Sequence, residues 1–92
     1  MATYFMFGRY SAPAVKEISK ARTKEVERVI EQYDGKLRDA YALLGQWDLA
    51  FIVEWPGIEE ALQASVQLTK ATGISFSCAP AIAVEEFDKL VG

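Results

Sequence analysis

The segments of this chain that are typical of β-strands are mostly apolar on both of their faces. Aromatic and β-branched residues are concentrated at residues 3–10, 47–55 and 74–79, and a further segment, residues 36–44, has Leu37, Tyr41 and Leu43 opposite Ala40, Ala42 and Leu44. A sheet with one face in water alternates apolar with polar residues. In residues 47–55, however, the large residues at 49, 51, 53 and 55 oppose Ala50 and Ile52. Both faces of the predicted sheet therefore need to be covered.

Two amphipathic helices are expected between these strands. Apolar residues recur at three- and four-residue steps over residues 13–33 and again over residues 58–72. We expect Gly35, in the left-handed conformation, to end the first helix and Gly73 to end the second. A short third helix is predicted over residues 85–91.

The order strand, helix, strand, strand, helix, strand is that of ferredoxin-like folds. We therefore predict one α+β domain over residues 1–92, with a four-stranded antiparallel sheet and both helices on one face. The other apolar face is expected to meet the sheet of a second copy, which gives a homodimer or a higher oligomer of the dimeric α+β barrel type. A hydrophobic content of 51% in only 92 residues agrees with such burial between subunits.

The composition excludes several classes of function. Histidine is absent and Cys78 is the one cysteine, so we predict no metal site, no cofactor, no disulfide and no His-based nucleophile pair. Cys78 is expected to be a small buried hydrophobic residue. A free thiol and the lack of a targeting or membrane-spanning segment favour the cytoplasm and exclude a membrane partner. The net charge of −3, with basic residues interleaved with acids, argues against nucleic acid.

The most specific motif is the turn Gly45-Gln46-Trp47-Asp48 between the second and third strands. It resembles the Gly-x-Tyr-Asp hairpin of the GYD-domain family, with Trp47 in place of Tyr, and the resemblance covers nearly the whole chain. The hairpin is also similar to that of the ligand-sensing domain of the leucine-responsive (feast/famine) regulators. Both resemblances imply a dimeric α+β barrel. The second implies small effectors bound where such hairpins meet between subunits.

Five residues are candidates for ligand binding, and each has a structural alternative: Arg9, Tyr41, Gly45, Trp47 and Asp48. Gly45 suits a turn position with positive φ, and Asp48 suits a turn whose backbone N–H groups need an acceptor. Because the first and third strands are adjacent in this fold, an Arg9–Asp48 ion pair is expected. Tyr41 and Trp47 either line a cavity or pack between subunits.

Three functions follow from these residues. The first is a homo-oligomeric module that binds a small molecule in a barrel cavity or at a subunit contact. The second is a cofactor-independent enzyme of the monooxygenase- or isomerase-like barrel class. Without histidine, its base would be Asp48 or Glu54 with a pKa raised by burial. The third is a structural oligomer without a ligand. We favour binding over catalysis.

Overall fold

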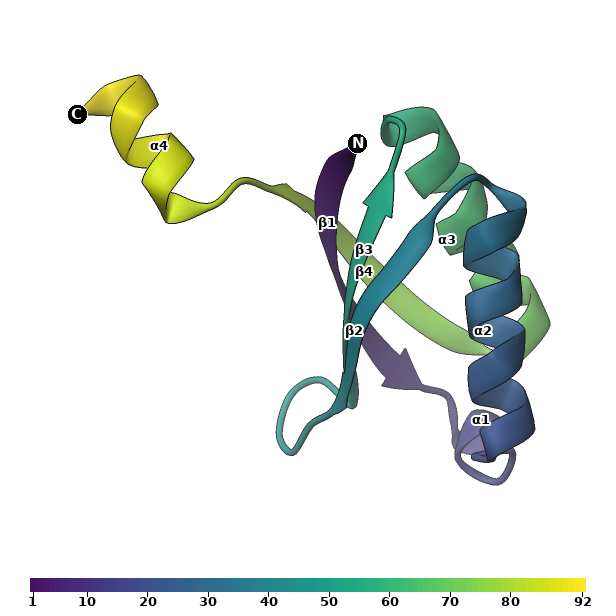
Figure 1. The fold of residues 1–92 in the computed structure, drawn as a ribbon. Helices are drawn as coiled ribbons and strands as arrows, with labels where there is room; N and C mark the ends of the chain where they lie inside the picture. Colours follow the sequence, from purple (N-terminus) through teal and green to yellow (C-terminus); the bar gives the residue numbers. More distant parts are fainter.

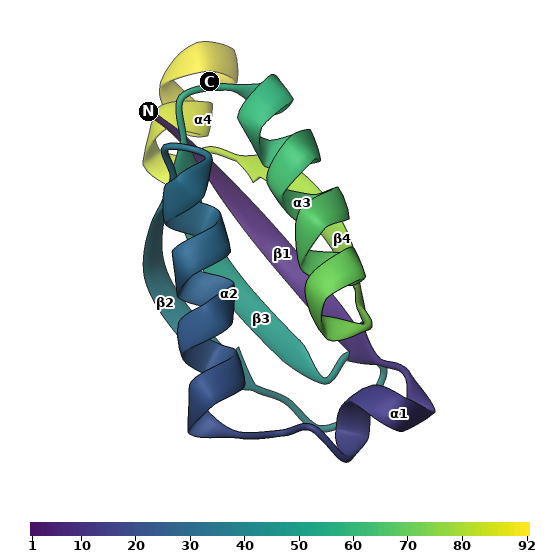
Figure 2. The same ribbon diagram turned by 90° about the vertical axis from the view of Figure 1, so that its right-hand side faces the viewer.

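The computed structural model describes residues 1–92 and contains four strands and four helices. In chain order they are β1 (Ala2–Tyr10), α1 (Ala12–Val15), α2 (Lys20–Gln32), β2 (Lys36–Ala42), β3 (Leu49–Trp55), α3 (Ile58–Thr72), β4 (Ile74–Ala81) and α4 (Val84–Val91). The strands form one antiparallel sheet in the order β2-β3-β1-β4. Helices α2 and α3 lie side by side on one face of it (Figures 1 and 2). The predicted ferredoxin-like α+β fold is confirmed.

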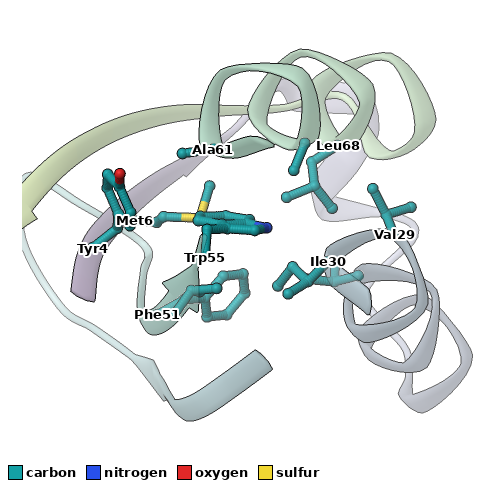
Figure 3. Close-up of a cluster of buried hydrophobic side chains, with 11 residues drawn as sticks. Tyr4, Met6, Val29, Ile30, Phe51, Trp55, Ala61 and Leu68 are labelled. Atoms are coloured by element: carbon teal, nitrogen blue, oxygen red, sulfur yellow. The ribbon is translucent and has the colours of Figure 1, made fainter. Parts of the chain in front are cut away.

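The core lies between the sheet and these two helices. Alternate residues of β1 and β3 point toward the helices, and Met6, Val53 and Trp55 among them are fully buried. Ile30 of α2 and Leu68 of α3 pack against this layer (Figure 3). Burying a large apolar side chain of this kind contributes roughly 1.5–3 kcal/mol, so these contacts fix the helices on one face.

The helix predicted over residues 13–33 is two helices in the structure. The Ser11 side chain caps α1 by accepting the Ala14 N–H, and Ser19 caps α2 by accepting the Arg22 N–H. Val15 and Ile18, which belong to the apolar repeat of residues 13–33, are exposed. The prediction of one continuous helix was wrong because the Ser19 hydroxyl offers the backbone a new helix start.

The turn after α2 uses Asp34, and not Gly35, as its left-handed residue. Asp34 has φ of 64°, whereas the glycines with positive φ are Gly45 and Gly73. Gly35 is constrained by space instead. A Cβ atom there would lie 2.6 Å from Cδ1 of Trp55 and 2.9 Å from Cγ2 of Ile30. The expected end of α3 at Gly73 is confirmed, with φ of 75°.

Strand β2 contains a β-bulge, and the residues after the bulge point to the sheet face opposite to the one that an unbroken strand would give them. Leu37 pairs with Val53, but the next pair is Asp39 with Ile52, so Arg38 is the extra residue. Leu37 and Ala40 therefore share the helix-covered face, and Tyr41 lies on the other. An unbroken alternation along residues 36–44 would put Leu37 and Tyr41 on the same face, and that expectation was wrong because of the bulge. The strand also ends at Ala42 and β3 begins at Leu49, so the loop between them is longer than predicted.

The sheet face away from α2 and α3 is called the open face here. Phe5, Phe7, Ala50 and Ile52 lie on it by register, and Phe5 is 37% exposed. Helix α4 stands off on this side of the sheet (Figure 1), and each of its residues is exposed. None of the four helices has the length and apolar character needed to cross a lipid bilayer.

Candidate functional site

The Arg9 side chain holds the β2–β3 hairpin against β1. Its Nε and Nη2 atoms both donate to the backbone carbonyl of Gln46, at 3.1 and 2.8 Å. Its guanidinium also lies 5.0 Å from the centre of the Trp47 ring, a cation–π distance. Trp47 in turn contacts Phe7, with ring centroids 5.9 Å apart. A side chain near the end of β1 is thus bound to the hairpin through one carbonyl and one ring.

Asp48 makes the second connection between the hairpin and β1. Its Oδ2 accepts the backbone N–H of Tyr10 at 2.8 Å, and its own N–H donates to the Gly8 carbonyl at 2.8 Å. Its carbonyl accepts the Leu43 N–H and closes the loop. The Asp48 carboxylate does accept a backbone N–H, as expected, but the expectation that this N–H belongs to the turn was wrong, because it belongs to Tyr10 of β1. We call these contacts of Arg9, Gln46, Trp47 and Asp48 the hairpin clasp.

The expected Arg9–Asp48 ion pair does not form. The ion pairs of the structure are Arg28–Glu25, Arg38–Glu54 and Lys89–Glu86. Because the Asp48 carboxylate accepts a backbone N–H and Arg9 donates to a carbonyl, each charged group has a backbone partner instead. Both are charge-assisted hydrogen bonds, which are stronger than neutral ones.

Gly45 serves the geometry of the loop. Its φ is 116°, and a Cβ atom placed there would meet nothing within 4 Å. The conformation, and not crowding, is therefore what favours glycine. This confirms the positive-φ role expected from the sequence.

Tyr41, the fifth candidate, is separate from the hairpin clasp. Ala50 pairs with Tyr41 on one side and with Phe7 on the other, so a small residue lies between two aromatic ones on the open face. Tyr41 is 54% exposed. The structure thus brings Arg9, Trp47 and Asp48 together and places Tyr41 across β3 from them.

The sequence did not predict a cavity of about 300 Å³ between α2 and the sheet. Its one charged lining residue is Arg22, whose guanidinium lies 5.0 Å from the centre of the Tyr10 ring and donates to the Ala14 carbonyl. The residues that line the cavity are Tyr10, Ile18, Ser19, Arg22, Thr23, Val26, Ala40, Tyr41, Ala42, Leu49, Phe51 and Ile74. Alanines at 40 and 42 are the sequence signal, because larger side chains on that face of β2 would occupy this space.

The titratable groups with clearly shifted pKa values are Arg38, Glu54 and Cys78, and all three lie outside this cavity. Arg38 donates to Glu54 at 2.9 Å, and this hydrogen bond lowers the pKa of the Glu54 carboxyl while raising that of Arg38. Burial raises the pKa of the Cys78 thiol, and the nearby Ser65 hydroxyl opposes that rise. Neither change gives a base with a pKa near neutrality.

A βαββαβ sheet whose Gly-x-aromatic-Asp hairpin is clasped to the first strand defines a ferredoxin-like α+β domain with a conformationally constrained hairpin. Residues 4–91 match the sequence model of the GYD domain, and the chain belongs to the GYD domain family. No curated protein and no solved structure was found to match the chain.

Proposed function

We propose that this GYD domain is a homo-oligomeric module that binds a small molecule. In this proposal, two copies join through their open faces, and the ligand occupies the cavity between α2 and the sheet. The observation that carries it is that the domain has both an apolar sheet face without a helix layer and a cavity whose lining includes one positively charged side chain, that of Arg22. A free thiol at Cys78 agrees with a reducing compartment such as the cytoplasm.

The open face supports association of two copies. Phe5, Phe7 and Ile52 make its centre apolar, while the Arg38–Glu54 pair lies toward one edge. Contiguous apolar patches of this kind are uncommon on monomers and mark interfaces. A symmetric pair would place the same patch on both sides of the contact, as isologous dimers do.

The cavity supports a ligand with an apolar body and an anionic group. About 300 Å³ is at the lower end of the range for small-molecule sites. Most of the lining is apolar, and the one charge, that of Arg22, is positive. An arginine fork binds carboxylates with two parallel hydrogen bonds. Small aromatic or aliphatic monocarboxylates are therefore the ligand class we propose.

A second candidate seat is the subunit contact itself. Arg9, Trp47 and Tyr41 all lie on the open face, around Phe7 and Ala50. A second sheet laid over them would enclose aromatic rings and a guanidinium. We rank this seat below the cavity because Arg9 already donates twice to the Gln46 carbonyl.

Catalysis by the two carboxylates considered from the sequence has less support. Asp48 accepts a backbone N–H, and Glu54 is paired with Arg38, which lowers its pKa. A general base at neutral pH needs a raised carboxylate pKa. Pure assembly, the third alternative, becomes the conclusion if the ligand test below is negative.

The oligomer is tested by light scattering at tens of micromolar. We expect the wild type at twice the monomer mass or more. Phe5→Asp, which puts a charge on the open face, should yield a monomer. The matched control Val66→Asp adds the same charge on the outer side of α3, where Val66 is exposed, and should not change the mass. A monomeric wild type would contradict the proposal.

The ligand site is tested by thermal shift with a panel of small monocarboxylates and their amides. We expect carboxylates to raise the melting temperature of the wild type and of Arg28→Gln, but not that of Arg22→Gln. Ala42→Leu should fill the cavity and abolish the shift, whereas Ala71→Leu, on the exposed side of α3, should retain it. If no compound shifts the wild type, or if Ala42→Leu responds like it, the cavity is not the ligand site.

A further inference from the structure

We infer that residues 82–92 form an arm that docks on a second copy of this chain. The inference rests on the proposed association through the open face and adds an element to it. The arm consists of a short connection after β4 and helix α4. In this arrangement, α4 of each copy lays its apolar side on the sheet of the other.

Helix α4 has a defined apolar side. Val84, Phe87, Leu90 and Val91 fall within one arc of the helix, at spacings of three, six and seven residues. Glu85 and Glu86 lie in the first turn and Lys89 in the last, which suits the helix dipole. The helix is therefore amphipathic, with its charges placed as in a helix that packs on a protein surface.

The rest of the chain does not cover this apolar side. Phe87 is 51% exposed and Leu90 is 74% exposed, and α4 contains no buried residue. The helix has eight residues. Isolated helices shorter than about 12–15 residues are marginal in water, and most helix stability in proteins comes from packing of the apolar face. A surface outside this chain is needed to supply that packing.

The position of α4 indicates which surface that is. The chain leaves β4 toward the open face, and α4 stands on the side of the sheet opposite α2 and α3, clear of the domain body (Figures 1 and 2). A second sheet packed on the open face would lie about 10 Å from the first. It would occupy the side of the molecule into which α4 extends. A second copy is thus the occupant that covers the open face and α4 together.

A hollow where the arm begins supports the same occupant. A space of about 430 Å³ lies between the open face and the start of the arm, lined by Thr3, Phe5, Ile52, Ala81, Ile82, Ala83 and Val84. Its lining is almost entirely apolar, and it is continuous with the open face through Phe5 and Ile52. Apolar side chains from a second copy would fill it, so the arm and the open face form one docking surface.

Hydrogen exchange of the α4 amides tests the arm separately from the dimer. The wild type is compared with Phe5→Asp, each with its mass measured by light scattering. We expect the α4 amides to be protected in the wild-type dimer and to exchange freely in the Phe5→Asp monomer. Equal protection in that monomer would mean that α4 folds back on its own chain and would overturn the inference. Free exchange in a proven wild-type dimer would also overturn it, while leaving the proposed association intact.

Side-chain truncation on the two sides of α4 gives a matched comparison. Phe87→Ala removes the largest apolar group, and Glu86→Ala removes a charge from the polar side of the same turn. We expect Phe87→Ala to raise the dimer dissociation constant at least about tenfold, as truncation of a buried aromatic anchor does, and Glu86→Ala to leave it within about twofold. Both side chains are exposed in the single chain, so neither change should prevent folding. Equal dissociation constants for the two variants would overturn the inference.

Discussion

The Asp48 carboxylate accepts the backbone N–H of Tyr10 at 2.8 Å, two residues past the last β1–β3 pair, Gly8 with Leu49. Because the pairing of β3 with β1 does not extend to Tyr10, the Asp48 side chain supplies the hydrogen-bond acceptor that a backbone carbonyl of a paired strand would supply. We expect Asp48→Ala to leave the partly buried Tyr10 N–H without its acceptor and to lower the free energy of unfolding by about 1–3 kcal/mol. Urea denaturation measures this. Asp48→Asn keeps an acceptor oxygen and should lose less; equal losses for both variants would contradict this role.

Gly35 is predicted to be intolerant of any side chain. A methyl group there would meet the Trp55 indole and Ile30, and both of these side chains are fully buried in the core. We expect Gly35→Ala to lower the free energy of unfolding by about 1–3 kcal/mol, as overpacking does. Gly57→Ala is the control, because its nearest neighbour is a flexible Glu60 carboxylate at 3.5 Å. A Gly35→Ala protein as stable as the Gly57→Ala protein would show that the indole can shift.

The Arg38–Glu54 pair is predicted to make the free energy of unfolding depend on pH in the acidic range. The Arg38 hydrogen bond lowers the pKa of Glu54 in the folded protein. The pair therefore stabilises the fold above the ordinary glutamate pKa of about 4.3, and this contribution is lost as the pH falls through the lowered value. Urea midpoints between neutral pH and strong acid should fall less steeply for Glu54→Gln than for wild type. Superimposable pH profiles would rule the contribution out.

Cys78 is predicted to react slowly with thiol reagents. Burial raises the pKa of its thiol, so less thiolate is present at a given pH. We expect a chromogenic disulfide to react more slowly with the folded protein than with the chain in urea. The rate should rise with pH about a midpoint above the ordinary thiol value of about 8.5. Cys78→Ser provides the blank. Equal rates for folded and unfolded chain would show the thiol to be freely accessible.

The elements were predictable where local chemistry and periodicity agreed. Gly45 has the positive φ expected of it, Gly73 ends α3 as expected, and the four strands occur where apolar residues cluster. The break at Ser19 was not predicted because Val15 and Ile18 continue the helical period through it. The bulge at Arg38 was not predicted for another reason. The residues after it, Ala40, Tyr41 and Ala42, do not alternate between polar and apolar, so the one-residue shift leaves no trace in their polarity pattern.

The site was predictable in its residues and less so in its contacts. Arg9, Trp47 and Asp48 do meet, as the neighbouring strands imply. The predicted partner of Arg9, the Asp48 carboxylate, was wrong. The sequence shows which residues carry opposite charges, but it does not show which backbone carbonyl a loop places near Arg9. The cavity exists because of the distance between helix α2 and Ala40 and Ala42 of the sheet. The residue spacing in the sequence does not specify that distance, so the cavity was not predicted.

The bond between Arg9 and the Gln46 carbonyl has a consequence for how this hairpin tolerates change. The guanidinium recognises a main-chain oxygen, which every amino acid carries, and the Gln46 side chain is exposed. In a saturation library, position 46 should therefore accept most substitutions that keep the loop conformation, while positions 9 and 48 on either side of the contact should accept few. One position of this short motif thus supplies an essential main-chain carbonyl while the side chain at the same position is free to vary.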